Sequence, residues 1–242
     1  MILKIKNYYN KQSFHPNFLS ILINPFYIIR KGLFRHIKTK APILKGTMLD
    51  FGCGIKPYQS LFVNVENYIG VDIDNEAHSH EKESIDVYYD GKTIPFGNEH
   101  FDSVFSSEVF EHVFNLDEIL IEINRVLKKE GIALITVPFA WDEHEIPYDF
   151  GRYTSFGIKH VIEKAGFEVI SLDKNGNSIA VIHQLFIVYL RNLLFTKNKY
   201  FNIIVNFIFL APFTILGLLM MNILPKNRKL YFNNIVLAKK IK

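Results

Sequence analysis

The stretch "LDFGCGIKPY" (residues 49–58) decides the fold class, because a short apolar run ends in an acid and then breaks into glycines. This pattern is typical of a strand that leads into a loop around a nucleotide-like ligand. The loop contains Gly52 and Gly54, but Pro57 stands where a dinucleotide loop needs its third glycine. Proline suits the first turn of a helix yet offers no N–H to a phosphate. The pattern therefore argues against NAD or FAD.

Strand-like and helix-like stretches alternate through the middle of the chain. Strands are predicted at 47–52, 67–74, 85–90, 100–107, 132–139, 167–173 and 231–240, and helices at 57–62, 115–131 and 154–167. The helix at 115–131 is the clearest, because its apolar residues recur every three or four positions. The alternation predicts an α/β fold with a Rossmann-like, seven-stranded, mostly parallel sheet and helices on both faces.

Charge is distributed unevenly along the chain. Residues 1–46 contain nine Lys and Arg residues and no acid, and residues 174–242 contain ten and again no acid. All 24 acidic residues therefore lie in 47–173, although the net charge of the whole chain is only +4. An acidic globular body with basic flanks predicts that the flanks face something anionic. The long apolar runs in these flanks argue against a nucleic-acid surface and favour an anionic membrane surface.

An apolar insert separates the sixth and seventh predicted strands. Residues 179–190 and 201–224 contain no charged side chain, and the second stretch is long enough to span a bilayer. A single crossing is excluded if both strands belong to one sheet, and two crossings would export Lys197 and Lys199 against the positive-inside tendency. The sequence therefore favours a helical hairpin in the membrane interface, with ordinary helices packed on the body as the alternative.

We expect three parts in the chain. They are a basic, apolar, helical segment at 1–46, a Rossmann-like domain at 47–173 and 231–242, and a membrane-facing helical hairpin at 174–230. The single cysteine, Cys53, excludes a disulfide framework, and charges stand where a signal peptide would need an apolar run. These features predict a cytoplasmic protein, peripheral at the inner face of the membrane. The sequence leaves the oligomeric state open.

Four stretches in order resemble the class I S-adenosylmethionine-dependent methyltransferases. They are "LDFGCGIKPY", "YIGVDID" (68–74), "DGKTIPFGNEHFDSVFSSEVFEHV" (90–113) and "RVLKKEGIALITVPF" (125–139). The resemblance covers about residues 47–173 and 231–240 and includes the branch that acts in surface-polysaccharide or lipid-linked pathways. It implies S-adenosyl-L-methionine as the cofactor. Lys56 stands where that family often has a further glycine.

The resemblance also implies a set of cofactor-binding residues. They are Asp50, Gly52, Gly54, Asp72, Asp90, Ser106 and His112. By analogy the two glycines approach the methionine and ribose, Asp50 helps hold the methionine end, Asp72 accepts from the ribose hydroxyls and Asp90 lies where adenine is contacted. Each residue taken singly has a structural alternative, as a turn residue or a strand-end solvated acid.

The loop "VPFAWDEHEIPYDFGRYTSFG" (137–157) is the predicted acceptor side, because it follows the fifth strand at the ligand-binding edge of the sheet. His144 is the first choice for a general base, since its unperturbed pKa lies near working pH. Asp149, Arg152 and Tyr153 complete the candidate catalytic set. The alternatives are a structural histidine and a structural Asp149–Arg152 ion pair.

No metal site is predicted, because no further ligand cluster follows His112 at a metal-site spacing. A magnesium site in "WDEHE" (141–145) is a minor alternative. We expect a methyltransferase that O-methylates a small-molecule or lipid-linked acceptor, such as a lipid-linked glycan presented at the membrane. The alternatives are a quinone or lipid headgroup as the acceptor, or a non-catalytic, membrane-anchored binding module.

Overall fold

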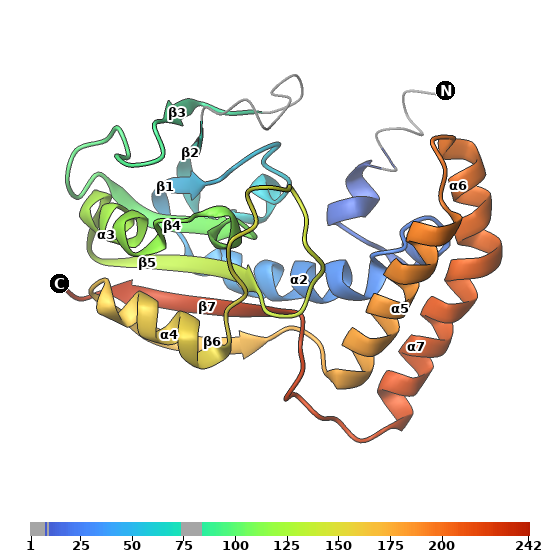
Figure 1. Cartoon of the computed structure of the whole chain (residues 1–242). Helices are drawn as coiled ribbons and strands as arrows, with labels where there is room; N and C mark the ends of the chain where they lie inside the picture. Colours follow the sequence, from blue (N-terminus) through green and yellow to red (C-terminus); the bar gives the residue numbers. More distant parts are fainter. Residues whose placement is uncertain (1–7, 9, 74–83) are drawn as a thin grey trace. The chain divides into compact units, whose positions relative to one another are not determined.

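The computed structural model describes residues 8, 10–73 and 84–242, which fall into two compact units (Figure 1). The sheet unit comprises Ile37–Asp173 and Asn233–Lys242. The helical unit comprises Met1–His36 and Lys174–Phe232. Asp74, the last residue of the predicted second strand, lies outside the described residues.

A seven-stranded sheet with the order β3-β2-β1-β4-β5-β7-β6 forms the sheet unit. Its strands are β1 (Gly46–Phe51), β2 (Val65–Ile73), β3 (Val87–Tyr89), β4 (Phe101–Ser107), β5 (Leu127–Pro138), β6 (Phe167–Lys174) and β7 (Asn233–Lys240). The pairs from β3 through β5 are parallel, whereas β7 runs antiparallel to β5. The predicted Rossmann-like, mostly parallel sheet is confirmed. Its order reverses between β1 and β4, which places a topological switch point there.

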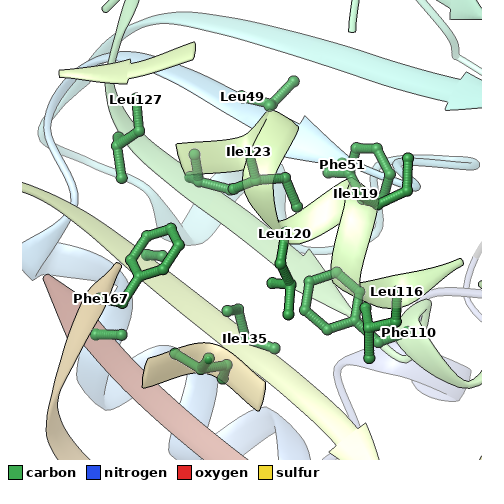
Figure 2. Close-up of a cluster of buried hydrophobic side chains, with 14 of the residues drawn as sticks. Leu49, Phe51, Phe110, Leu116, Ile119, Leu120, Ile123, Leu127, Ile135 and Phe167 are labelled. Carbon is green, nitrogen blue, oxygen red and sulfur yellow. The ribbon is translucent and has the colours of Figure 1, made fainter. Parts of the chain in front are cut away.

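Two helices, α3 (Leu116–Val126) and α4 (Ser155–Lys164), pack on one face of the sheet. Leu120 and Ile123 of α3 are fully buried and point toward Phe51 and Ile135 of the sheet (Figure 2). Each large aliphatic side chain buried in this way contributes about 1.5–3 kcal/mol. The helical spacing in the sequence therefore predicted both the helix and the face that it buries.

The opposite face of β4 is covered by aromatic residues that follow β1. The Phe105 ring packs against Phe62, with centroids 4.8 Å apart, and meets Tyr58 edge-on. The helix expected at 57–62 is only a short 3₁₀ turn, η3 (Gln59–Leu61). A second 3₁₀ turn, η2 (Ala41–Ile43), precedes β1.

The boundary between α3 and β5 differs from the prediction. The helix was expected to run to residue 131, but α3 ends at Val126 and β5 begins at Leu127. Leu127 pairs with Phe101 of β4, and the Lys128 ammonium lies 2.7 Å from the Asp102 carboxylate. Glu130 has a left-handed φ of 64°, which no helix accommodates. Strand pairing therefore overrides the helical propensity of the Lys-Lys-Glu run.

The helical unit contains the apolar insert between β6 and β7. Its elements are η1 (Phe18–Leu22), the first part of α2 (Tyr27–Lys40), α5 (Ser178–Leu194), α6 (Lys199–Val205), the π-helical turn η6 (Asn206–Leu210) and α7 (Ala211–Ile223). The last three form one 25-residue helix that is long and apolar enough to cross a membrane by length and composition. The buried Gln184 amide donates to the Pro25 carbonyl at 2.8 Å, which ties α5 to the N-terminal segment.

Candidate active site

A cavity of about 470 Å³ opens at the carboxyl ends of β1, β2, β3 and β4, within the sheet unit. This is the edge of the sheet, beside the switch point, where open α/β sheets bind ligands. Its volume falls within the range of small-molecule sites. The wall is formed by Phe51, Gly52, Gly54, Asp72, Ile73, Tyr89, Gly91, Glu108, Val109, His112, Val113, Phe114, Asn115, Glu145, Tyr148 and Phe150.

The glycine loop after β1 forms one wall of this cavity. Gly52 has a φ of +72°, and a Cβ placed there would lie 2.4 Å from a methyl carbon of Val109. Gly54 has a φ of +46°, and a Cβ there would meet no atom within 4 Å, because it faces open space. The Gly54 N–H donates to the Asp72 carboxylate at 2.8 Å. The loop is thus held against the end of β2 with its second glycine toward the cavity.

Lys56 turns away from the loop toward the edge between β2 and β3. Its ammonium lies 2.5 Å from the Asp86 carboxylate, which also accepts from the Gly70 N–H at 2.6 Å. Burial alone would raise the pKa of Asp86, but the hydrogen bonds from Lys56 and Gly70 outweigh it and lower the pKa below its usual value. The lysine that departs from the family pattern therefore holds this loop to the sheet, a role the sequence did not reveal.

Asp50 lies beneath the loop, 3% exposed, and its carboxylate accepts a hydrogen bond from the Tyr68 hydroxyl. Burial raises the pKa of Asp50 to about 7, in spite of the Tyr68 hydrogen bond, which lowers it. Its side chain faces away from the cluster that contains the neighbouring Leu49 and Phe51, since successive strand residues point to opposite faces. Asp50 is thus a buried acid whose charge depends on pH near neutrality.

Two further predicted cofactor residues, Asp90 and Ser106, are not among the residues that line the cavity. The exposed Asp90 carboxylate accepts from the N–H groups of Thr93 at 2.7 Å and Lys92 at 2.9 Å. These bonds lower the pKa of Asp90 and fix the turn after β3, whose Tyr89 and Gly91 do line the cavity. Ser106 is 1% exposed, and its hydroxyl has no hydrogen-bond partner among the described residues.

Glu108, which the sequence analysis did not single out, lines the cavity just after β4. Its carboxylate accepts from the Thr136 hydroxyl at 2.8 Å and from the Asn233 amide at 2.5 Å. Its φ of +56° is left-handed, an uncommon conformation outside glycine. Three strands therefore converge on this carboxylate. The polar Asn233-Asn234 pair at the start of an otherwise apolar strand was the available sequence signal.

His112 and Tyr148 also line the cavity. The Nδ1 of His112 lies 2.7 Å from the Tyr148 carbonyl oxygen, and its Nε2 lies 3.5 Å from the Glu145 carboxylate. Burial lowers the pKa of His112, which favours a neutral ring. Glu111, the residue before His112, is fully buried. Burial raises its pKa well above the usual range, and the charge of Glu108 adds to the effect.

The predicted acceptor loop is held by an ion pair. The Arg152 guanidinium donates to both Asp149 carboxylate oxygens, at 2.5 and 2.6 Å. Burial would raise the pKa of Asp149, but Arg152 and the His144 N–H bring it down to about 2. The His144 ring packs edge-to-face on His112, with centroids 4.8 Å apart. Tyr153 packs against the core cluster, and its carbonyl accepts from the Asn234 amide at 2.7 Å.

The central part of the sequence is similar to known proteins. Residues 49–135 match the model of a methyltransferase domain family. Two uncharacterized proteins of Methanocaldococcus jannaschii are 33% and 35% identical over 98 and 112 residues, which are 39% and 46% of this chain. The alignments span 38% and 52% of the relatives' own lengths, so the chain matches about half of each or less.

Solved structures share the fold at low sequence identity. A Haemonchus contortus phosphoethanolamine N-methyltransferase bound to S-adenosyl-L-methionine aligns with a TM-score of 0.55 at 20% identity, covering 93% of this chain and 56% of that one. An S-adenosylmethionine-dependent methyltransferase of Mesorhizobium loti aligns with a TM-score of 0.54 at 11% identity, covering 86% and 98%. The [4+2]-cyclase SpnF aligns with a TM-score of 0.54 at 16% identity, covering 87% and 80%.

The glycine loop, the acid at the end of β2 and the strand order agree with the family match. Gly52 admits no side chain, and Gly54 leaves the space beside it open, as a loop that cradles a ligand requires. Residues 49–135 therefore belong to a methyltransferase domain, and the Rossmann-like sheet that contains them shares its fold with S-adenosylmethionine-dependent methyltransferases.

Proposed function

We propose that this protein transfers the methyl group of S-adenosyl-L-methionine to a hydroxyl group of an acceptor that enters the same cavity. The observation that carries the proposal is that two unlike groups of residues line one cavity. One group is Gly52, Gly54 and Asp72, and the other includes His112 and Tyr148. A methyl transfer needs this arrangement, because donor and acceptor must meet in line.

On the cofactor side, the chain's own residues bind and orient. S-adenosyl-L-methionine supplies an electrophilic methyl group on a sulfonium. Gly54 gives the cofactor close access to the backbone, and Asp72, which lines the cavity, accepts from the N–H groups of Gly54 and Ile73. Each carboxylate oxygen accepts more than one hydrogen bond, which suits ribose hydroxyls as further donors. Asp50 and Asp90 act from beneath and beside the cavity wall in this proposal.

On the acceptor side, aromatic rings and polar groups alternate. The Phe114 and Phe150 rings meet edge-to-face with centroids 5.3 Å apart, and Tyr148 packs on Phe150 at 6.5 Å. Such a wall suits an acceptor with an apolar or planar portion. His144 is the proposed base that takes the acceptor's proton, while Asp149, Arg152 and Tyr153 position its loop.

Methyl transfer is tested with methyl-labelled cofactor and fractionated membrane lipids and glycans. We expect label in a lipid-extractable product with one S-adenosylhomocysteine formed per methyl transferred. His144→Asn should lower kcat at least about tenfold with little change in cofactor affinity, as loss of a general base does. The control His160→Asn, on an exposed face of α4, should leave turnover unchanged. Equal turnover in both variants would remove His144 from the proposed mechanism.

We also propose that the helical unit docks on an anionic membrane surface and that residues 174–230 are its main contact. The long helix from Lys199 to Ile223 has a mean hydropathy of 2.4, yet only 33% of its most apolar window is buried. Its large exposed apolar side chains are Tyr200, Phe201, Ile203, Ile204, Phe207, Ile208, Phe209, Phe213, Ile215, Leu216, Leu219 and Ile223. An exposed apolar surface of this extent is typical of a membrane or partner contact.

The basic residues Lys226, Arg228 and Lys229 follow this helix directly, and all three are exposed. They favour an anionic surface, since juxtamembrane basic side chains are attracted to acidic lipids. The proposal therefore places the protein at the periphery of the cytoplasmic leaflet. An acceptor carried by a lipid, such as a lipid-linked glycan, is presented at such a surface.

Vesicle flotation tests this docking. The full chain should float with vesicles containing phosphatidylserine, and the double variant Phe207→Asp, Phe209→Asp should lose most of this binding. Phe156→Asp is the matched control, because Phe156 is 83% exposed but lies on α4 of the sheet unit. Replacing Lys226, Arg228 and Lys229 with Gln should weaken binding to anionic vesicles more than to neutral ones. Unchanged flotation of the Phe207/Phe209 variant would contradict the proposal.

A lipid headgroup or a quinone is the second candidate acceptor. A phosphoethanolamine N-methyltransferase shares the fold at 20% identity, so an acceptor of this kind is included in the assay. The likeness to a [4+2]-cyclase adds a reason to measure product directly, because one fold supports different chemistries. Stoichiometric S-adenosylhomocysteine with an acceptor present separates methyl transfer from cofactor binding alone, which a non-catalytic module would show.

A further inference from the structure

Glu111 is a buried carboxyl group without the contacts that such a group needs. Its side chain is 0% exposed, and neither carboxylate oxygen has a hydrogen-bond partner among the described residues. Burying an acceptor group in this way costs free energy, and native proteins rarely leave such a group unsatisfied. The unsatisfied oxygens therefore require either a proton or a ligand.

Two histidines lie close enough to Glu111 to bind one metal ion together with it. Glu111, His112 and His144 each offer one donor atom, and these atoms all lie within 4.8 Å of one another. The Nε2 of His112 is 3.8 Å from a Glu111 oxygen. Donors bound tetrahedrally at about 2.0–2.1 Å from one metal ion are about 3.4 Å apart, so modest side-chain rotation brings the set to coordination distance.

Hydrogen bonds orient the ring nitrogens of both histidines. Nδ1 of His112 lies 2.7 Å from the Tyr148 carbonyl oxygen, which only accepts, so Nδ1 carries the proton and Nε2 keeps its lone pair. Nδ1 of His144 lies 3.3 Å from the Asp142 carbonyl oxygen and 3.4 Å from a carboxylate oxygen of Asp149. Histidines that bind metals are held by such bonds at the other nitrogen.

We propose that Glu111, His112 and His144 bind one divalent transition-metal ion, with zinc as the ion that fits the donors best. Two imidazoles and one carboxylate form a donor set found in zinc enzymes that keep an open coordination position. His112 lines the cavity, and Glu145, whose carboxylate is 3.5 Å from its Nε2, lines it as well. The open position therefore faces the space assigned to the acceptor.

The sequence concealed this site because its third donor comes from another segment. Glu111 and His112 are adjacent in η5 (Phe110–His112), whereas His144 belongs to the loop after β5. The backbone N–H groups of Phe150 and Gly151 donate to the Glu111 carbonyl at 2.7 and 3.2 Å and fasten that loop over η5. Fold contacts, and not local spacing, assemble the three donors.

The use of the ion rests on the proposed function, but its binding does not. A hydroxyl-bearing acceptor that reaches the open position would lose its proton more readily, since a divalent cation favours the ionised oxygen. With the ion bound, His144 would be a ligand and would no longer act as the base. The methyl group would then pass from sulfur to that oxygen, the sulfur–carbon bond would break with its electron pair left on S-adenosylhomocysteine, and the proton would leave to Glu145 or to solvent. A weakly ionised alcohol would be a better substrate with the ion than without it.

The test is a Co²⁺ titration of the full chain after treatment with a chelator, without cofactor or acceptor. We expect one equivalent to bind with visible absorption typical of nitrogen and oxygen ligation, and Zn²⁺ to displace it. Glu111→Gln, His112→Ala and His144→Asn should each weaken binding at least about tenfold. Glu143→Gln and His160→Asn are matched controls, since both side chains are exposed and outside the donor set.

Thermal unfolding supplies the second measurement. Zn²⁺ should raise the Tm of the wild-type chain and of the control variants, but not that of Glu111→Gln, because a ligand stabilises the state that binds it. Equal Co²⁺ affinity in the wild type and the Glu111→Gln variant would overturn the proposal. So would an absence of Co²⁺ binding to a folded wild-type chain, which would make Glu111 a protonated carboxyl. Cofactor binding is measured separately, so failure of the metal site leaves the methyltransferase proposal standing.

Discussion

The carboxylate of Asp72 accepts a hydrogen bond from the backbone N–H of Gly54 at 2.8 Å. The acid at the end of β2 therefore holds the loop that follows β1. Strands β1 and β2 are parallel neighbours whose register pairs Asp50 with Gly70 and Phe51 with Val71, so the loop after β1 lies beside the end of β2. One side chain thus shapes the loop and faces the cavity at the same time, and this links the fold to cofactor binding.

Replacing Asp72 with Ala should weaken S-adenosyl-L-methionine binding at least about tenfold. The change removes both the Gly54 hydrogen bond and the proposed acceptor for the ribose hydroxyls, and charge-assisted hydrogen bonds are worth about 1.5–3 kcal/mol each. Isothermal titration measures the affinity. Asp173→Asn is the control, because Asp173 makes only a partly exposed ion pair with Lys40, at 2.9 Å. An unchanged affinity in Asp72→Ala would remove this residue from the cofactor site.

Substitution of the two loop glycines by alanine should affect stability to different extents. Gly52→Ala should lower the free energy of unfolding by about 1–3 kcal/mol, because the new Cβ would overlap Val109 and the backbone is left-handed. Gly54→Ala should cost less stability, about 1 kcal/mol, because nothing lies within 4 Å, yet it should weaken cofactor binding. Urea unfolding and isothermal titration separate the two effects. Equal stability losses would contradict this description of the loop.

The helical spacing of apolar residues and the polar residues that bound the apolar runs predicted most of the sheet unit. The spacing of Leu120 and Ile123 identified α3 and its buried face, and the apolar runs located all seven strands to within a few residues. The start of β5 was missed because Lys128 and Glu130 have helical propensity locally. The early start of β5 depends on the pairing of Leu127 with Phe101 of β4, which no local pattern reveals.

The candidate site was only partly visible in the sequence. Gly54 and Asp72 were predictable from their places relative to the strands. Gly54 lies in the loop after β1 and Asp72 lies near the end of β2, and the carboxyl ends of both strands lie at the same edge of the sheet. The approach of His144 to His112 was not, because it depends on how the loop after β5 folds back. Burial of Glu111 was equally hidden, since a charged residue beside a histidine ordinarily indicates an exposed surface.

The stability of the protein should fall as pH rises from about 4 to about 7 because of Asp50. Its pKa is raised from 3.8 to about 7, so in this range the folded state keeps a proton that the unfolded state has released. The shift sets an upper limit of about 4 kcal/mol. Urea unfolding across this range measures the slope.

Asp50→Asn should flatten that slope, because an amide does not titrate. Tyr68→Phe should instead extend the decline to higher pH, since it removes the hydrogen bond that lowers the Asp50 pKa. An equal slope in wild type and Asp50→Asn would show that another group causes it.

The Asp149–Arg152 pair should stabilise the acceptor loop. Asp149→Asn should lower the free energy of unfolding by about 2–4 kcal/mol at neutral pH, because Arg152 would lose the buried carboxylate that it pairs with. In the wild type this stability is present above pH 4 and is lost as pH falls toward 2, since the Asp149 pKa is about 2 instead of 3.8. Asp142→Asn is the control, because the contact of Arg152 with Asp142 is to the backbone carbonyl, which the substitution keeps. Similar losses in both variants would contradict a specific role for the pair.

Equilibrium dialysis of the full chain with labelled S-adenosyl-L-methionine measures whether the cavity binds this cofactor. We expect saturable binding of one cofactor per chain, displaced by S-adenosylhomocysteine and unaffected by NAD, with the Asp72→Ala variant binding at least about tenfold more weakly. No binding by a folded chain, or displacement by NAD, would contradict the assignment of the cavity.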